Sequence, residues 1–473
     1  MKTRVFILIL LVLTVYSCSN GVEWISTTET DPWVKRSPDA IFVNHSDNID
    51  VEILQENSFQ VIEGFGACFN ELGWTSLSKL SAADREYILR ELFKPNHGAN
   101  FTVTRKPVAA NDFSREWYSY NETEGDFEMA DFSIANDYET LIPFIRAAKE
   151  FNPDLKIWGS PWSPPSWMKW NKHYACAVPW DDLPLQFHNN LPEDRQGSEG
   201  TNMFIMEDEY LSAYALYFTK YIEAYRAEGI DVTMVMPQNE PNSCQIFPSC
   251  TWTSAGMAKF IGEYLGPAMD KLGVEIYFGT HERPSEELVD SILNDPRASQ
   301  FVKGLGFQWA GKYAVPGLHQ RYPHLPIYQT EQECGDGKND WDHAEYAWSL
   351  KKHYLSNGTN FYLYWNISLL EGGFSRWGWQ QNSLVTVDPE NRTYRFNHEY
   401  YLMKHLSHFV MPGAKRVDTR GEFDDILAFV NPDGSVVAVL YNDQAEERDL
   451  FLKIGGKTLK ATLAAKSFNT IVI

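Results

Sequence analysis

Short apolar runs recur along the chain, and most are followed by polar residues and then by a stretch with helical spacing. Eight runs are predicted to be strands: residues 60–69, 100–108, 155–162, 232–240, 275–282, 304–310, 325–333 and 360–368. Amphipathic helices are predicted at residues 81–93, 137–151, 208–228 and 254–272. Eight strands that alternate with helices predict an α/β protein built on a closed (β/α)8 barrel, the TIM-barrel fold.

The pattern changes near residue 412. The stretch DDILAFVNPDGSVVAVLYND reads as two short strands joined by a hairpin turn at NPDG, and further strand-like runs follow. Residues 39–55 are also strand-like and precede the first barrel strand. We therefore predict a β-sandwich formed by both ends of the chain. Residues 19–58 supply its N-terminal segment, residues 59–411 form the barrel, and residues 412–473 complete the sandwich.

Residues 1–18 have the features of a signal peptide. Lys2 and Arg4 precede an apolar run from residue 5 to residue 15, which is too short to span a bilayer comfortably. The ending TVYSC resembles a bacterial lipoprotein cleavage site, which would make Cys18 the lipidated first residue. Because Tyr16 is not the small residue usually found there, an ordinary secretory signal is the alternative. The prediction is an exported protein, lipid-anchored in a bacterial envelope on either its periplasmic or its outer face.

The charge of the chain excludes some partners. With 41 basic and 63 acidic residues, the net charge is −22, which disfavours binding to nucleic acid and to anionic lipid. Membrane contact is expected only through the N-terminal anchor. The sequence contains no HExxH motif, no zinc spacing of Cys and His, and no Gly-rich phosphate loop, so neither a metal nor a cofactor is predicted.

Five cysteines follow Cys18, too few and too scattered for a disulfide framework. Cys244 and Cys250 flank a short loop and could pair. The 16 tryptophans are a stronger signal, because several lie in Gly-, Pro- and Ser-rich stretches such as GSPWSPPSWMKW. Burial in the core accounts for part of them, and the others are interpreted as flat platforms for sugar rings.

Two glutamates stand at the ends of predicted strands. Glu240 ends the run VTMVMPQNE, and Glu331 lies at the end of the seventh predicted strand. The C-terminal ends of barrel strands face one cleft, so the two carboxylates are expected to meet there. Paired carboxylates across a cleft suit retaining glycoside hydrolysis, with one as nucleophile and the other as general acid/base. Asn239 can then hydrogen-bond the 2-hydroxyl of the sugar.

Several longer stretches carry a specific resemblance. They are GFGACFNE (64–71), RKPVAANDFS (105–114), SPWSPPSWMK (160–169), MPQNEP (236–241), QTEQECG (329–335) and KSFNTIVI (466–473). With these stretches the chain resembles glycoside hydrolase family 30, the family of glucosylceramidases, β-1,6-glucanases and related β-glycosidases. They span nearly the whole chain after the signal peptide.

The resemblance implies roles for individual residues. Glu240 would be the acid/base and Glu331 the nucleophile, and Arg105 would lie behind the nucleophile. The sugar subsite would be lined by Glu71, Asp112, Trp162 and Asn239, with Trp365 and Trp377 as further pocket residues. For Arg105 and Asp112, a structural ion pair is the alternative to direct sugar contact.

The chain departs from the family pattern after the sixth strand. The family often places a His and a nearby Tyr there, where this chain has Gln308 and Ala310. We therefore expect Gln308, as a further substrate-site residue, or His281 to steady the nucleophile by a hydrogen bond. A second acid, Glu333, follows Glu331, and strand alternation would point both side chains to the same face. Glu331 is preferred because it directly follows Thr330, as the family pattern requires.

The sequence thus predicts a secreted retaining β-glycosidase that acts on β-linked glucose. An endo-β-1,6-glucanase is the first expectation, and a glucosylceramidase or small β-glucosidase is the alternative. A non-catalytic glycan-binding lipoprotein on a hydrolase barrel would need the aromatic platforms but neither glutamate. Loop shape decides between cleavage within chains and cleavage from their ends.

Overall fold

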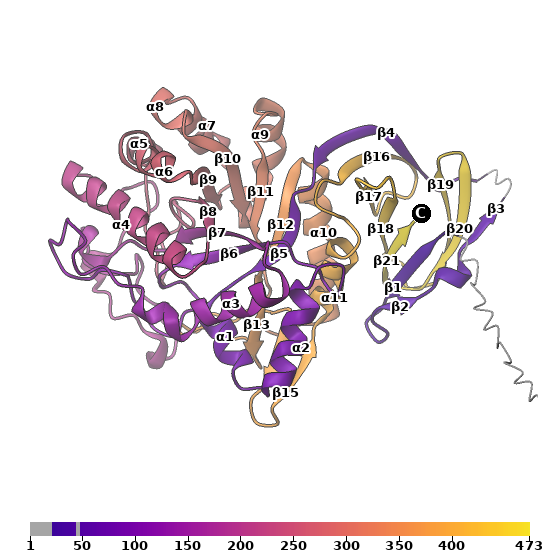
Figure 1. The fold of residues 1–473 in the computed structure, drawn as a ribbon, viewed down its shortest axis with the longest axis horizontal. Coiled ribbons are helices and arrows are strands. Elements are labelled where there is room, and N and C mark those ends of the chain that lie inside the picture. The colour runs from indigo at the N-terminus through magenta and orange to yellow at the C-terminus, as the bar shows by residue number, and fades with distance from the viewer. Residues whose placement is uncertain (1–20, 44–47) are drawn as a thin grey trace, which may run out of the picture.

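The computed structural model describes residues 21–43 and 48–473, so the predicted signal peptide and Cys18 lie outside the described residues. Eight parallel strands form a closed barrel, as predicted (Figure 1). In chain order they are β5 (Gly64–Cys68), β6 (Val103–Val108), β7 (Lys156–Pro161), β8 (Val232–Val235), β9 (Glu275–His281), β10 (Val302–Gln308), β11 (Ile327–Glu331) and β12 (Thr359–Asn366). β12 pairs with β5 and closes the ring.

Helices surround the barrel (Figure 1). They are α1 (Glu71–Leu77), α2 (Ala82–Phe93), α3 (Leu141–Phe151), α4 (Asp208–Ala227), α5 (Ser254–Lys259), α6 (Gly266–Leu272), α7 (Glu286–Leu293), α8 (Pro296–Ser299), α9 (Val315–Arg321), α10 (Trp341–Ser356) and α11 (His398–Ser407). Among the described residues, none of these helices has both the length and the apolar character needed to cross a membrane.

Local sequence explains where the helices begin and end. The Ser81 hydroxyl accepts the Asp84 N–H at 3.1 Å and caps α2. The predicted helix at 254–272 is divided, because a π-helical stretch at Phe260–Leu265 joins α5 to α6. It ends at Gly273, whose φ of 65° suits a left-handed helix stop. Short 3₁₀ helices lie at Ser37–Asp39, Ala135–Glu139, Ser166–Met168, Leu185–Phe187, Glu193–Arg195 and Trp309–Tyr313.

A second sheet draws on both ends of the chain, which confirms the predicted sandwich. Its strand order is β2-β1-β21-β18-β17-β16-β4-β19-β20-β3. These strands are β1 (Glu23–Thr27), β2 (Val34–Lys35), β3 (Ile41–Val43), β4 (Val51–Val61), β16 (Lys415–Gly421), β17 (Ile426–Val430), β18 (Val436–Asn442), β19 (Arg448–Ile454), β20 (Lys457–Leu463) and β21 (Ser467–Val472). A small sheet of β13 (Ser368–Leu370), β14 (Val385–Asp388) and β15 (Thr393–Phe396) follows β12.

The sandwich braces the barrel through strands that are buried on both faces. In β18, Ala438 packs into the core of the sandwich, whereas its neighbours Val437 and Val439 join the core of the barrel. Strands buried on both faces are apolar throughout, as the run VVAVLY shows. At the same junction the His405 ring on α11 hydrogen-bonds the Thr470 hydroxyl of β21 at 2.8 Å. The sandwich therefore packs against the barrel through α10 and α11.

Candidate active site

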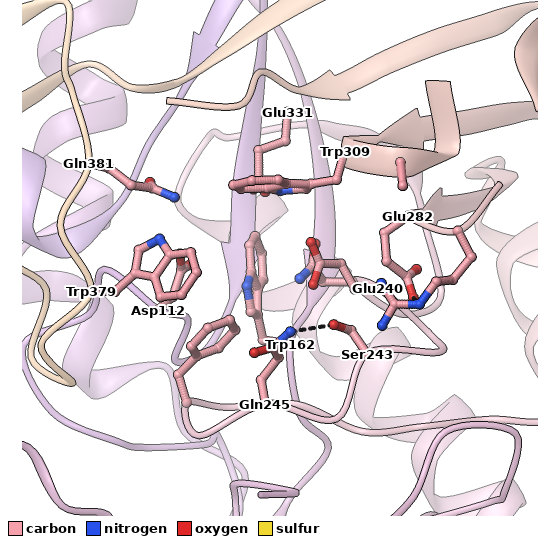
Figure 2. A pocket seen from close by; sticks show the side chains of 14 residues that line it. Asp112, Trp162, Glu240, Ser243, Gln245, Glu282, Trp309, Glu331, Trp379 and Gln381 are labelled. Atoms are coloured by element: carbon pink, nitrogen blue, oxygen red, sulfur yellow. Dashed lines mark hydrogen bonds and ion pairs between the residues drawn. The ribbon is translucent and has the colours of Figure 1, made fainter. Parts of the chain in front are cut away.

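A pocket of about 220 Å³ opens at the C-terminal ends of the barrel strands (Figure 2). Four acidic side chains contribute to its wall, and they are Asp112, Glu240, Glu282 and Glu331. Four aromatic side chains form its flat surfaces, and they are Trp162, Phe247, Trp309 and Trp379. Acidic groups between aromatic rings give the pocket both charge and stacking surface.

Backbone contacts to both neighbouring strands position Glu240. The segment after β8 is held on one side where the Asn239 N–H donates to the Pro161 carbonyl at 2.7 Å. On the other side the Glu240 N–H donates to the Thr280 carbonyl at 3.1 Å. Glu240 itself has a φ of 49°, a left-handed conformation that is unfavourable for a non-glycine residue. Such strain at a pocket residue indicates that its placement is maintained by the surrounding structure.

The Asn239 side chain is oriented by three donors to its carbonyl oxygen. Oδ1 accepts from Arg105 Nη2 at 2.6 Å, from the Thr280 hydroxyl at 2.9 Å and from Gln308 Nε2 at 3.2 Å. Among the described residues its amide nitrogen donates to no partner, and Asn239 lines the pocket. The network therefore leaves an N–H₂ donor available to a ligand.

Glu331 is the last residue of β11 and is only 5% exposed. Its Oε2 accepts from Arg105 Nη1 at 2.9 Å, and its Oε1 accepts from Trp309 Nε1 at 3.1 Å. Arg105 is fully buried, and its guanidinium also donates to the Ser160 hydroxyl. Glu331 thus has a buried cation and a neutral N–H, one on each oxygen.

Glu240 has only neutral side-chain donors. Its Oε1 accepts from Gln308 Nε2 at 3.0 Å. Burial raises the pKa of the Glu240 carboxyl, and hydrogen bonds from Gln308 and Ser243 oppose that rise only in part. Burial also raises the pKa of Glu331 to about 7. The Arg105 charge lowers this pKa, and the Glu240 charge raises it further. The two carboxyls are close enough to affect each other's titration, and Arg105 favours the anion on Glu331.

The structure separates Glu331 from Glu333, and the expectation that both point to one face is wrong. β11 ends at Glu331, so strand alternation does not extend to Glu333. The Glu333 carboxylate instead pairs with Lys312 Nζ at 2.6 Å and accepts from the Tyr346 hydroxyl at 2.7 Å. It is not part of the pocket wall.

The expected source of the hydrogen bond to Glu331 is also wrong. Gln308 donates to Glu240 rather than to Glu331. His281 Nε2 contacts the Ser285 carbonyl at 3.0 Å, and burial lowers the pKa of the ring to about 4. Trp309, which the sequence argument did not select, supplies the bond instead. Its φ is 47° and it lines the pocket. Its place directly after Gln308, near the end of the predicted strand at 304–310, was the available signal.

Trp162 lines the pocket, with Trp365 directly behind it. The two rings stack at 5.2 Å with an interplanar angle of 24°. The Arg105 guanidinium carbon lies 4.3 Å from the centre of the Trp162 ring. Trp365 is fully buried and supports the pocket wall without forming it.

Asp112 and Glu71 lie in different surroundings. Asp112 is on the pocket wall, and its Oδ1 has no hydrogen-bond partner among the described residues. Glu71 lies outside the pocket wall, at the start of α1. Its carboxylate accepts from Arg115 Nε at 3.0 Å, from Asn136 Nδ2 at 2.9 Å and from the Thr140 hydroxyl at 3.1 Å. The structure therefore places Glu71 in a buried polar network rather than on the pocket wall.

The loop after β13 presents a different tryptophan from the one the sequence suggested. Trp377 is buried and donates to the Tyr174 hydroxyl at 3.2 Å, whereas Trp379 lines the pocket. Gln381 on the same loop lines it as well. An irregular loop has no periodicity that would tell which of two tryptophans faces inward.

The described cysteines form no disulfide. Cys244 and Cys250 are free thiols, as are Cys68, Cys176 and Cys334. Between residues 21 and 473, apart from residues 44–47, no group of His, Cys, Asp or Glu side chains is arranged to hold a metal ion.

A (β/α)8 barrel with strand-end glutamates and tryptophans around one pocket is the architecture of a glycoside hydrolase. The chain belongs to glycosyl hydrolase family 30. The family model of the TIM-barrel domain matches residues 62–179 and 175–410, and that of the β-sandwich domain matches residues 413–471. The fold and the enzyme class predicted from the sequence are thus confirmed.

Relatives in this family carry two kinds of names. The chain is 30% identical over 419 residues to putative glucosylceramidase 4 of Caenorhabditis elegans, covering 81% of this chain and 75% of the relative. It is 29% identical over 415 residues to the endo-1,6-beta-D-glucanase neg1 of Aspergillus fumigatus, covering 81% and 78%. Among solved structures, SrfJ from Salmonella typhimurium shares the fold, with a TM-score of 0.84 at 24% identity over 96% of this chain and 99% of that one.

Proposed function

We propose that the protein is a retaining β-glycosidase in which Glu331 is the nucleophile and Glu240 the general acid/base. The observation that carries this assignment is the unequal set of partners around the two carboxyls. Glu331 contacts the buried Arg105 cation and the Trp309 N–H, whereas Glu240 contacts the neutral Gln308 amide. An anion is more stable beside a cation, so the pair holds its charge on Glu331 and its proton on Glu240.

This charge placement suits a double displacement. In the first step Glu331 attacks the anomeric carbon, the glycosidic C–O bond breaks, and Glu240 gives its proton to the leaving oxygen. In the second step Glu240 takes a proton from water, the water oxygen attacks the anomeric carbon, and the ester bond to Glu331 breaks. Each step inverts the anomeric carbon, so the product keeps the substrate's configuration. The free amide N–H₂ of Asn239 is placed to donate to a hydroxyl of the bound sugar, and we assign it the 2-hydroxyl.

We propose β-linked glucose as the sugar and β-1,6-glucan as the natural substrate. The name of the Aspergillus fumigatus relative, an endo-1,6-beta-D-glucanase, supports this choice. A glucosylceramide or a small β-glucoside is the second candidate, supported by the name of the Caenorhabditis elegans relative. The two candidates share a glycone and differ in the leaving group and in what surrounds the pocket.

Export and anchoring belong to the same proposal. Lys2, Arg4 and the apolar run that follows support secretion, and Cys18 supports lipid attachment. Mass spectrometry of the N-terminal peptide from the cell envelope would show a diacylglyceryl mass on Cys18. Cleavage elsewhere with an unmodified N-terminus would contradict the anchor.

The central test follows the products formed from linear β-1,6-glucan by the purified protein without its signal peptide. We expect soluble glucose oligosaccharides by chromatography, and no product from Glu331→Gln at the same concentration. Proton NMR of an aryl β-glucoside reaction should show the β-anomer of glucose first. If the α-anomer appears first, the enzyme inverts and the assignment of Glu331 as nucleophile is wrong.

A further inference from the structure

Exposed aromatic side chains gather on two loops beside the pocket. Trp180 is 47% exposed and Phe374 is 53% exposed. The Trp180 ring lies 5.9 Å from the ring of Trp379, which lines the pocket. Phe187 stacks parallel to Phe374 at 6.5 Å. We call Trp180, Phe187, Phe374 and Trp379 the aromatic cluster.

The two loops that carry this cluster are packed against each other. A Cβ on Gly378 would lie 2.9 Å from Leu183 Cδ1 and 3.0 Å from Phe187 Cδ2, and Gly378 has a φ of 81°. Arg376 Nη1 donates to the Gln186 carbonyl at 3.0 Å and so joins the loops. Rings held in this way lose little conformational entropy when a ligand binds.

The cluster meets the pocket on the side away from the acid/base. Figure 2 shows Trp379 and Asp112 on one side of the pocket and Glu240 on the other. In the proposed mechanism the leaving group lies beside Glu240, because Glu240 protonates it. Trp379 therefore faces the glycone side, toward the non-reducing end of a bound chain.

The chemistry of the cluster favours a sugar chain over a lipid surface. Trp180 is followed directly by Asp181 and Asp182, both exposed. Flat rings beside carboxylates offer stacking for the apolar face of a sugar and acceptors for its hydroxyls. Inserting two carboxylates into a lipid surface would be costly, and the net charge of −22 opposes anionic lipid. Leu185, at 84% exposed, is an aliphatic side chain on the same loop as Trp180 and Phe187.

We infer that the aromatic cluster is a distal subsite that binds glucose units on the non-reducing side of the bond to be cleaved in a β-glucan. This inference rests on the proposed function, because the assignment of sides uses Glu240 as the acid/base. It predicts cleavage within chains, since an enzyme that removes single end units has no use for a subsite beyond the glycone.

The test compares two substrates in three variants. Trp180→Ala and Phe374→Ala alter exposed rings outside the pocket wall, and Phe59→Ala on β4, at 48% exposed, is the matched control. For each of the two cluster variants, kcat/KM on β-1,6-glucan should fall about tenfold, equivalent to about 1.4 kcal/mol, mainly through KM. On an aryl β-glucoside, which has no second sugar on the glycone side, kcat/KM should stay unchanged. Phe59→Ala should change neither.

Each other outcome overturns the inference in a distinct way. An equal loss on both substrates means that the rings only support the pocket. A loss on glucosylceramide vesicles but not on glucan means that the cluster binds lipid. A wild type that cleaves the aryl glucoside but leaves glucan intact, or releases only glucose from it, refutes the distal subsite while the two-carboxylate mechanism stands.

Binding can be measured without turnover. In a native gel that contains β-1,6-glucan, the Glu331→Gln protein should be retarded, and adding Trp180→Ala should abolish the retardation. Retardation that Trp180→Ala leaves unchanged overturns the inference, as does a Glu331→Gln protein that the glucan does not retard. If the wild type cleaves no β-glucoside at all, the proposed function fails, and the gel still decides whether the cluster binds glucan.

Discussion

At the C-terminal end of the barrel the pocket encloses about 220 Å³, and at the N-terminal end a second cavity encloses about 280 Å³. The larger cavity is lined by the first residues of the strands, among them Lys156 of β7 and Glu275 of β9. Both of these charged residues are exposed to solvent. The volume of a cavity alone therefore does not show which end of the barrel carries the active site.

Polar groups are satisfied differently at the two ends. At the N-terminal end the Tyr328 hydroxyl donates to Glu63 and accepts from Tyr277, and the Trp158 N–H is the unpartnered buried atom among the lining residues described. At the C-terminal end, within the described chain, a carboxylate oxygen of Asp112 and one of Glu282 lack partners. Buried carboxylate oxygens are costly to leave unpaired, so they indicate a site built for a ligand.

The backbone shows the same contrast. Glu240 and Trp309 have φ values of 49° and 47°, and both line the C-terminal pocket. Among the described residues that line the N-terminal cavity, none has a positive φ. At the N-terminal end of the barrel the strands begin in regular conformation. At the C-terminal end they are followed by loops that place single side chains on the pocket wall. The placement of side chains and their unmet hydrogen-bonding capacity, rather than cavity volume, therefore define the site.

Replacing Glu331, the proposed nucleophile, should show the contrast most strongly. Glu331→Gln removes the attacking oxygen anion, and kcat on β-1,6-glucan should fall by about a thousandfold or more. Glu63→Gln at the opposite end is the matched control and should leave kcat within about twofold, because the amide can still accept from Tyr328. Residual Glu331→Gln activity within tenfold of wild type would remove Glu331 from the mechanism.

Replacing Glu240, the proposed acid/base, should lower activity by an amount that depends on the leaving group. Glu240→Gln should lower kcat/KM on β-1,6-glucan by about 10² to 10⁴, the usual contribution of general acid catalysis. An aryl β-glucoside with an acidic phenol leaves without a proton, so its glycosylation step should be affected much less. Pre-steady-state release of the phenol measures that step. Equal losses on both substrates would show that Glu240 does not act as the proton donor.

The sequence predicts the fold well because barrel strands and helices each leave a clear periodic signal. One boundary was hidden. The predicted strand at 60–69 merges the end of β4 with β5, because only two residues separate Val61 of the sandwich from Gly64 of the barrel. A continuous strand-like run does not show that the chain passes from one sheet to another.

Site residues were predictable where they end a predicted strand. They were not predictable where the conformation of a loop determines which side chain faces the pocket. Strand-end position selects Glu240 and Glu331, and it selects Glu282 equally well, since Glu282 ends the predicted strand at 275–282. Trp379 could not be separated from Trp377, because both lie on one irregular loop. The partners of Glu71 are far away in the sequence, so its hydrogen bond with Arg115 could not be predicted from the sequence.

Two hydrogen bonds should control opposite limbs of the pH profile. Trp309→Phe removes the N–H that lowers the pKa of Glu331, so that pKa rises. The nucleophile then ionises at higher pH, and the acid limb of kcat/KM moves upward. Gln308→Met removes a bond that lowers the pKa of Glu240, so the basic limb moves upward instead.

The measurement is kcat/KM on an aryl β-glucoside between pH 4 and pH 9 at constant ionic strength, about 0.1 M. Tyr328→Phe at the opposite end should leave both limbs in place. If Trp309→Phe shifts the basic limb and Gln308→Met shifts the acid limb, the assignment of nucleophile and acid/base must be exchanged. If both variants shift the same limb, the two bonds do not control separate carboxyls and the assignment fails.

Tyr328→Phe, in the N-terminal cavity, should produce the smallest effect of the variants proposed here. It removes the hydroxyl that joins Glu63 and Tyr277, and it keeps the ring that packs against Phe361. The loss of these bonds should lower the free energy of unfolding by about 0.5–1.5 kcal/mol each, or less where water reaches the freed carboxylate. Thermal unfolding should therefore shift downward by a few degrees, while kcat/KM on both substrates stays unchanged. A fall in activity without a fall in stability would mean that the N-terminal cavity communicates with the pocket, and the two ends could no longer be treated as independent.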